Sequence, residues 1–374
     1  FKTAEYIAAH LKSLGMEVQT GVAKTGVIGI LKGGKPGPVV ALRADIDALP
    51  VKERVELPWK SIATGSFNDN TVPVMHACGH DTHVAILMGV AEVLSTVKSE
   101  IKGTVKFVFQ PAEEGAPVGE EGGAKLMVKE GVLKNPDVEA IFGLHISSGS
   151  HVGEITYKPG GIMASSNSFE IIIHGKQTHG SSPWTGIDPI VTAAQIINNA
   201  QTIVSRNMQL TKEAAVVTFG SIHGGVRSNI IPEEVTLVGT IRTLDIEMRD
   251  KIFDRLKTIA TKTAESNGAT VEVTISEGYP ITYNNLALTD KMLPTLQSVA
   301  GNEHVTLVPA VTGAEDFSFF QKEIPGFYFF LGGTPTDVKI EDAPPHHTPD
   351  FYVDDSSMVL GIKAMSRLVI DYSM

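Results

Sequence analysis

Apolar residues in the N-terminal part of the chain alternate between helical and strand-like spacing, and this alternation predicts the order of the elements. Helical spacing predicts an amphipathic helix over 3–14, which ends at Gly15, and a more apolar helix over 84–97. Short apolar runs predict buried strands at 27–31, 39–42, 104–109 and 140–144. Because strands that alternate with helices form a largely parallel sheet, we expect ligands to bind at the carboxyl ends of these strands.

The pattern changes after Gly160 and Gly161. The predicted order becomes strand, helix, strand, strand, helix, strand, at 169–173, 189–204, 215–219, 235–241, 250–266 and 270–275. This β-α-β-β-α-β order is typical of a split βαβ sandwich. The first pattern resumes with a helix near 289–300, a strand at 326–331 and a final helix over 356–372. The sequence therefore predicts an α/β domain formed by 1–163 and 277–374, interrupted by an inserted α+β domain, 164–276.

The composition narrows the class of protein. The chain has 374 residues, of which 42% are hydrophobic and 20% charged, as in a globular protein. Its 31 Lys and Arg residues against 42 Asp and Glu residues give a formal charge of -11, which argues against nucleic acid or an anionic membrane as a partner. One cysteine cannot form an internal disulfide, and no stretch resembles a secretory signal or a membrane span. We therefore predict a cytoplasmic protein.

The segment 76–83, His-Ala-Cys-Gly-His-Asp-Thr-His, concentrates candidate metal ligands. It contains three histidines, an aspartate and the only cysteine of the chain. Thiolate and imidazole together suit a borderline-soft metal such as zinc, and Cys78 and His80 could point the same way. The alternative is a buried structural cysteine between surface histidines.

Further donors follow predicted strands or lie in loops: Glu113, Glu114, His145 and one of His346 and His347. Five donors would suit two metals that share a bridging ligand. Of the adjacent glutamates, one could bind metal while the other acts as general base. Each has an alternative interpretation when taken singly: the two glutamates as a solvated turn, His145 as a core histidine, and His346 and His347 as part of a surface loop. The nucleophile elbow, the phosphate-binding loop and the dinucleotide turn are absent from the sequence.

Five segments together resemble the M20 metallopeptidases, and in particular their amidohydrolase branch of aminoacylases, hippurate hydrolases, auxin-conjugate hydrolases and acetyl-diaminopimelate deacetylases. The segments are 42–50, 76–83, 110–115, 143–145 and 347–349. They follow the order of the family, and the resemblance covers the whole chain. It implies a mostly parallel mixed-sheet catalytic domain of the zinc-peptidase type. It also implies that the inserted ferredoxin-like domain serves as a lid and for dimerisation.

The resemblance implies a site with two divalent metals. We expect zinc first, with manganese, nickel or cobalt as alternatives, because the mixed ligand set tolerates several metals. Cys78 would be the bridging ligand. The remaining ligands would be His80, Glu114, His145 and His347. Glu113 would be the general base, and Asp47 would orient the imidazole of His80.

The resemblance also assigns residues outside the ligand set. His179 would reach the active site of a partner subunit and stabilise the oxyanion. Asn229 and Arg242 would bind the substrate carboxylate, and Gly313 would line the pocket with its backbone; a surface salt bridge and an ordinary turn are the alternatives for the last two. The chain departs from the family at Trp184, where a histidine is common.

The predicted function is hydrolysis of the amide bond of N-acyl amino acids by a metal-activated water, with a homodimer or higher homo-oligomer built through the inserted domain. A dipeptidase or carboxypeptidase of the same fold is the alternative enzyme. A metal-stabilised binding protein without catalysis is the alternative from another class; the intact Glu113 argues against it.

Overall fold

The computed structural model describes residues 1–117 and 119–374, and the chain forms two compact units. The first comprises Phe1–Ile162, Tyr283–Pro309 and Asp316–Met374, and the second Met163–Thr282 and Ala310–Glu315. The predicted fold class, a two-domain α/β protein with an inserted α+β domain, is confirmed.

The segment 310–315 groups with the second unit, whereas the sequence prediction placed it in the first domain. Backbone hydrogen bonds explain the difference. The amide of Ala164 donates to the carbonyl oxygens of Val311 and Gly313, at 3.2 and 2.9 Å. The sequence carried no signal for this pairing, because the segments are far apart along the chain.

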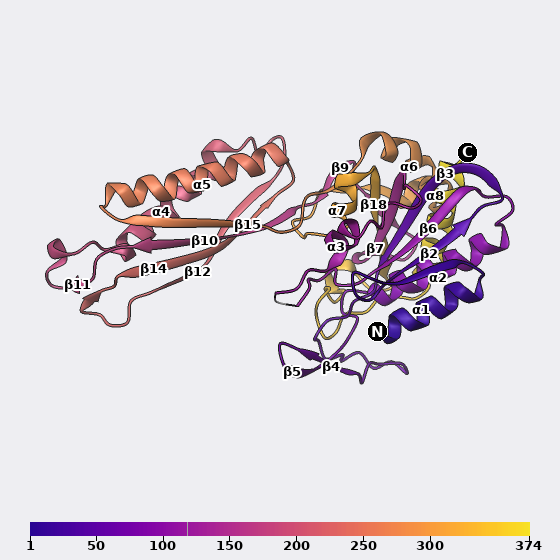
Figure 1. The fold of residues 1–374 in the computed structure, drawn as a ribbon, viewed down its shortest axis with the longest axis horizontal. Coiled ribbons are helices and arrows are strands. Elements are labelled where there is room, and N and C mark those ends of the chain that lie inside the picture. Colours follow the sequence, from indigo (N-terminus) through magenta and orange to yellow (C-terminus); the bar gives the residue numbers. More distant parts are fainter. Residues whose placement is uncertain (118) are drawn as a thin grey trace. The chain divides into compact units, whose positions relative to one another are not determined.

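The first unit is built on an eight-stranded mixed sheet with the order β1-β2-β6-β3-β7-β18-β8-β17 (Figure 1). The strands are β1 (Glu17–Val22), β2 (Gly26–Lys32), β3 (Lys35–Asp45), β6 (Lys102–Gln110), β7 (Ala140–His151), β8 (Ile155–Tyr157), β17 (Val305–Leu307) and β18 (Gly326–Thr334). The four central strands β6, β3, β7 and β18 pair in parallel, and β1, β2 and β8 pair antiparallel with their neighbours β2, β6 and β18. The carboxyl ends of the central strands therefore meet at one edge of the sheet.

Helices cover both faces of this sheet, as a parallel sheet requires. They are α1 (Lys2–Ser13), α2 (His80–Thr96), α3 (Gly123–Lys129), α6 (Leu286–Ala300), α7 (Ser318–Glu323) and α8 (Ser357–Tyr372). Residues of α1, α2, α6 and α8 form one apolar core with alternate residues of the strands, among them Leu42, Phe107 and Phe142. Helix α3 packs against α7 and β6.

Helix α2 begins at His80, one turn earlier than the predicted helix, and its N-cap is Gly79 with φ 89°. Asp81 and Thr82, which precede the predicted helix, therefore lie inside the observed one. A β-carbon at Gly79 would overlap Ile146 Cγ2, so both the backbone angle and the packing favour glycine there. The early start places His80 in the first turn of the helix.

The second unit has a four-stranded antiparallel sheet with the order β12-β14-β10-β15 (Figure 1). Its elements are β10 (Ser165–His174), α4 (Pro189–Thr202), β12 (Ala215–Gly224), β14 (Glu234–Thr243), α5 (Ile246–Ser266) and β15 (Thr270–Glu277), in the predicted order. The two helices pack on one face, where Ile171 and Leu237 meet Ile196 and Leu256 in a separate apolar core.

The remaining elements are short. The strand pairs are β4 (Thr64–Phe67) with β5 (Asn70–Pro73), β9 (Gly160–Met163) with β16 (Thr282–Asn284), and β11 (Thr178–His179) with β13 (Ile230–Ile231). The short helical turns are η1 (Pro183–Thr185), η2 (Ile203–Asn207), η3 (Asn302–His304) and η4 (Ile340–Asp342). Among the described residues, no helix combines the length and apolar character needed to cross a bilayer.

We predict that a fragment spanning 163–282 folds without the rest of the chain, because every residue of its buried apolar core lies within these bounds. Urea unfolding followed by circular dichroism should give one cooperative transition. Leu256→Ala in this fragment should lower the free energy of unfolding by about 2–5 kcal/mol, as expected for a fully buried leucine. A fragment without a cooperative transition would show that the second unit depends on the first.

Candidate metal centre

The predicted metal ligands come from four places in the first unit. Cys78 and His80 flank Gly79 at the start of α2, and Glu114 follows the carboxyl end of β6. His145 lies within β7, and His347 lies in the loop between η4 and α8. The meeting of parallel strand ends therefore gathers residues that are up to 269 positions apart, the separation of Cys78 and His347.

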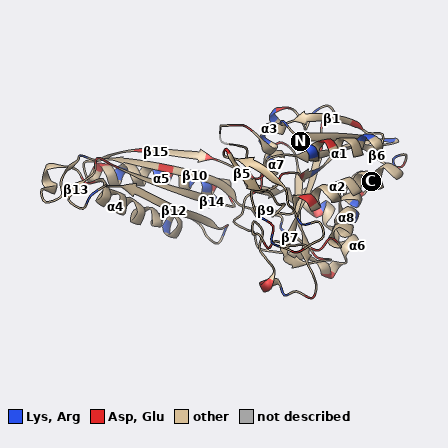
Figure 2. Cartoon of the chain, turned by 90° about the horizontal axis from the view of Figure 1, so that it is seen from below, with Lys and Arg blue, Asp and Glu red and all other residues tan. Residues whose placement is uncertain are grey.

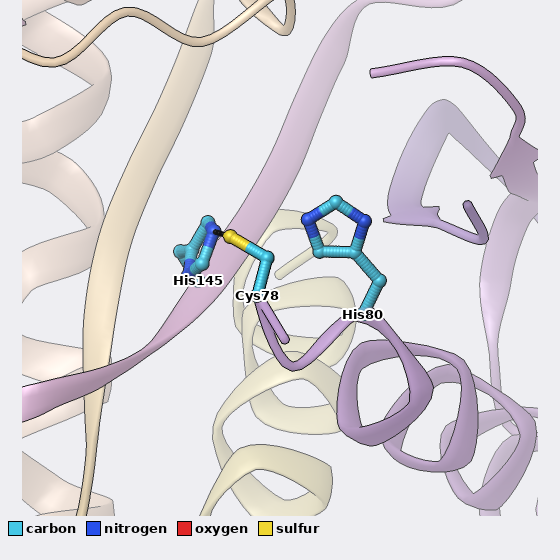
Figure 3. A group of neighbouring side chains, drawn as sticks. All are labelled: Cys78, His80 and His145. Atoms are coloured by element: carbon cyan, nitrogen blue, oxygen red, sulfur yellow. Dashed lines mark hydrogen bonds between the residues drawn. The ribbon is translucent and has the colours of Figure 1, made fainter. Parts of the chain in front are cut away.

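The ligand atoms form two overlapping triads. Cys78, His80 and His145 make one, Cys78, Glu114 and His347 make the other, and in each the ligand atoms lie within 4.8 Å of one another. Cys78 Sγ lies 3.4 Å from His145 Nε2 and 3.2 Å from His347 Nε2. Figure 3 shows the first triad, with the thiol of Cys78 directed at the ring of His145. Cys78 belongs to both triads, so it could bridge two neighbouring metals.

The donors fit a divalent metal. The Nε2 atom of His80 is buried and has no hydrogen-bond partner among the described residues, so it is available as a ligand atom. The opposite ring nitrogen, Nδ1, is held by Asp47, 3.1 Å from its carbonyl oxygen and 3.3 Å from Oδ1. One sulfur, three imidazoles and a carboxylate form the mixed donor set that zinc and related metals accept.

Asp47 contacts two of the ligand residues at once. Besides facing His80 Nδ1, its Oδ2 accepts a hydrogen bond of 2.9 Å from the backbone amide of Glu114. Groups of this kind fix the orientation of a metal ligand. The sequence predicted that Asp47 orients His80; the structure places Asp47 against His80 Nδ1 and also against the backbone of Glu114.

The two adjacent histidines of the C-terminal loop have different surroundings. His346 Nε2 accepts a hydrogen bond of 3.2 Å from the amide of Ser148, so its Nδ1 carries the proton and donates to the carbonyl oxygen of Cys78. Burial lowers the pKa of His346 to about 4, which keeps the ring neutral. His347, in contrast, has its Nε2 atom 2.8 Å from Glu114 Oε1, and its φ of 64° is rare for a residue with a side chain. The structure thus groups His347, not His346, with the other donors.

Buried charges shift the ionisation of the centre. Burial raises the pKa of the Cys78 thiol, and the charges of Glu114 and Asp45 add to this effect. Burial alone would lower the pKa of His80, but Asp45 and Asp47 outweigh it and raise this pKa to about 9. Without a metal the centre therefore holds protons on Cys78 and His80. Binding of a metal would displace them, because thiolate and neutral imidazole are the ligand forms.

His83 is a buried residue of the centre to which the sequence analysis gave no role. Its Nε2 accepts a hydrogen bond of 2.8 Å from the amide of Ile146, so Nδ1 carries the proton and donates to Asp45 Oδ1. His83 thereby connects the end of β3 with the residue that follows His145. Its spacing of three from His80, which places both on one face of α2, was the available signal.

The predicted oxyanion-stabilising residue and the predicted substrate-binding residues belong to the second unit. His179 lies on β11 and pairs with Ile230 of β13, and the amide of Gly180 donates to the carbonyl oxygen of Asn229 at 2.8 Å. The structure therefore brings His179 and Asn229 together. Arg242 lies on β14, opposite Ser166 and Val216, and Gly313 lies in the segment 310–315.

Comparison with known proteins identifies the class. The sequence matches peptidase family M20/M25/M40 over residues 41–371. It is 42% identical to a thermostable carboxypeptidase 2 from Saccharolobus solfataricus, covering 100% of this chain and 91% of that protein. It is 37% identical to an N-acetylcysteine deacetylase from Bacillus subtilis, covering 93% of this chain and 85% of the other. The YxeP protein of Bacillus subtilis, described as a dinuclear metal-binding peptidase, has a similar structure with a TM-score of 0.81, 33% identity and coverage of 99% and 91%.

Fold and ligand grouping are those of a metal-dependent hydrolase of amide and peptide bonds. The chain belongs to peptidase family M20/M25/M40, as the resemblance of its motifs predicted.

We predict that Cys78→Ala loses bound metal, because Cys78 is the residue that both triads share. Metal analysis of the purified variant should show a large loss relative to the wild-type chain. His304→Gln serves as the control, since this imidazole is half exposed and belongs to neither triad. Unchanged metal content in Cys78→Ala would show that Cys78 is a buried structural residue and not a metal ligand.

Proposed function

We propose that the chain is a two-metal amidohydrolase that removes the acyl group from the amino nitrogen of N-acyl amino acids. The observation that carries the proposal is the pair of ligand triads that share Cys78, with Glu113 beside them. Glu113 groups with His80 and Glu114 in a third set of ligand atoms within 4.8 Å of one another.

Each triad would hold one divalent metal, with Cys78 as the bridge. His80 and His145 complete one site, and Glu114 and His347 complete the other. Zinc is the first choice, and manganese, nickel and cobalt also suit this mixed ligand set. When bound, the metals polarise the scissile carbonyl and make water a better nucleophile. The dinuclear metal-binding character of the YxeP protein supports the assignment.

Glu113 is the general base in this proposal. The residue is 6% exposed and lies three positions beyond the carboxyl end of β6, next to the proposed ligand Glu114. It takes a proton from the attacking water and returns it to the leaving amine, so one carboxylate serves both proton transfers. Burial protects this exchange from bulk water.

In this proposal the remaining roles belong to residues of the second unit. His179 stabilises the oxyanion, Asn229 and Arg242 bind the substrate carboxylate, and Gly313 lines the pocket with its backbone. The chain works as a homodimer, or a higher homo-oligomer, in which His179 serves the centre of the partner subunit. Exposed apolar residues on the sheet of this unit support an interface there; they are Val216, Ile222 and Val238.

The amine product is an amino acid with a free carboxylate. The N-acetylcysteine deacetylase of Bacillus subtilis supports a small acyl group. The 42% identity to a carboxypeptidase favours a second candidate, in which the acyl part is a peptide and the enzyme acts as a carboxypeptidase or dipeptidase. Both candidates cut an amide whose nitrogen belongs to a carboxylate-bearing residue.

We place the enzyme in the cytoplasm and assign it neither a nucleic-acid nor a membrane partner. The single cysteine suits a reducing compartment, and the formal charge of -11 disfavours polyanionic partners. Figure 2 shows Lys and Arg interspersed with Asp and Glu along α5, rather than gathered by sign.

Glu113→Gln should reduce kcat by at least about 10²–10⁴-fold, because the amide cannot accept the proton, while the metal content stays at the wild-type value. Steady-state kinetics and metal analysis on the same preparation test this. Glu303→Gln, which alters an exposed glutamate outside the centre, is the control. A variant with near-normal kcat would remove Glu113 from the role of base.

A substrate panel separates the two candidates. N-acetyl and N-benzoyl amino acids and dipeptides are compared, each with a free and with an amidated carboxyl group, with and without chelator. We expect chelator-sensitive hydrolysis of the N-acyl amino acids that is lost when the carboxylate is blocked. Faster turnover of dipeptides would favour the peptidase, and no hydrolysis of any substrate with metal supplied would favour a binding protein.

A further inference from the structure

A buried ion cluster lies beside the centre and includes no proposed metal ligand. Its cation is Arg43 of β3, which is 1% exposed. Nη1 of Arg43 donates to Asp45 Oδ2 at 2.8 Å, Nη2 to Asp316 Oδ1 at 3.0 Å, and Nε to Gln110 Oε1 at 2.9 Å. Burial opposes ionisation of Asp45, but Arg43, with His80 and His83, outweighs it and holds the pKa of this carboxyl well below its usual range.

The second carboxylate of the cluster, Asp316, is also 1% exposed and is surrounded by hydrogen-bond donors. Besides Arg43, Gln110 Nε2 donates to its two oxygens at 2.7 and 2.8 Å, and the amide of Ala124 donates to Oδ2 at 2.7 Å. Gly123 has φ 63°, and a β-carbon there would overlap Asp316 Oδ2. The surroundings of this position are therefore matched to a carboxylate of this size.

Asp316 is connected to Glu113 in two ways. Its own backbone amide donates to Glu113 Oε1 at 3.4 Å. Its carboxylate also holds Gln110, the last residue of β6, three positions before Glu113. One residue thus restrains both the side-chain oxygen of Glu113 and the strand end that carries it.

We propose that Asp316 is a positioning residue for Glu113: clamped by Arg43, Gln110 and the Ala124 amide, it holds the general base in its working orientation. This inference rests on the proposed function, in which Glu113 is the base. A base acts only within hydrogen-bond reach of the proton it removes, so a small displacement of Glu113 costs rate while leaving the metals in place.

The test is Asp316→Asn in the full chain with its metals bound. Asparagine keeps the size of the side chain and the backbone amide. Its NH₂ group, however, replaces a carboxylate oxygen that accepts hydrogen bonds, and this group cannot accept them. We expect kcat to fall by up to about 10²-fold, with KM and metal content at their wild-type values. Metal content that falls in parallel with kcat, or an unchanged kcat, would overturn the proposal.

A double variant tests the hydrogen-bond pattern. Combining Asp316→Asn with Gln110→Glu supplies an acceptor for the new NH₂ group, keeps an acceptor for Arg43 Nε, and leaves the net charge unchanged. We expect a partial recovery of kcat over Asp316→Asn. No recovery, in a folded double variant with its metals bound, counts against positioning through this cluster.

Measuring Asp316→Asn in the Glu113→Gln variant distinguishes a role of Asp316 that acts through Glu113 from a purely structural role. If Asp316 acts through Glu113, adding Asp316→Asn to Glu113→Gln leaves the residual single-turnover rate unchanged. If the two losses multiply, Asp316 has only a structural role and the proposal fails. Near-normal turnover by Glu113→Gln itself would instead refute the proposed base, which keeps the two failures distinguishable.

Stability is measured on the same variants. Thr295→Val is the control, because it removes a partly buried hydrogen bond of 2.9 Å to Asp371 in the contact between α6 and α8. This control should unfold more easily and keep its kcat. If Asp316→Asn does not fold, Gln110→Met, which leaves Asp316 in place, should show the same selective loss of kcat. An unchanged kcat in Gln110→Met would then overturn the proposal.

Discussion

Parallel pairing of β6, β3, β7 and β18 is the constraint on which the metal centre depends. These strands are largely apolar because helices cover both faces of the sheet, and most of the polar residues of the centre lie at or near the strand ends. The register of β3, β6 and β7 then places Asp45, Gln110 and His145 at the same edge. The centre thus forms where the ends of several helix-covered strands meet, and its residues come from several elements.

The edge of the sheet contains several buried charges, which are stable there only because they form ion pairs and hydrogen bonds. Asp45 and Asp316 share the cation of Arg43, and His83 and Gln110 occupy further hydrogen-bonding positions around them. Desolvation makes each of these groups costly when it is left without a partner. A substitution of one residue in the cluster therefore leaves partners on several elements without a hydrogen bond or an ion pair, and we expect it to destabilise the fold around the centre.

Much of the fold could be predicted from sequence, because periodicity reports burial directly. Strands β2, β3, β6, β7 and β18, the inserted β-α-β-β-α-β unit and the donors near the strand ends follow from local patterns, whereas β1, β8 and β17 of the large sheet were not predicted. The spacing of His83 from His80 was a local signal, but the contacts of His83 with Asp45 and Ile146 and the pairing of Arg43 with Asp316 could not be predicted, since these residues are joined only by the completed sheet. The grouping of residues 310–315 with the second unit has the same origin: backbone pairing with a distant segment leaves no local signal.

The link between Arg43 and Asp316 spans 273 positions, and this has a consequence for the order of folding. The second unit draws its core from a nearly continuous segment, so it can fold while the C-terminal part of the chain is still being synthesised. The first unit has to wait for β18 and for the residues after it, because its central strands are completed only then. Assembly of the metal centre is therefore a late event in folding, and a ribosome-bound chain that ends before His347 lacks one of the proposed metal ligands.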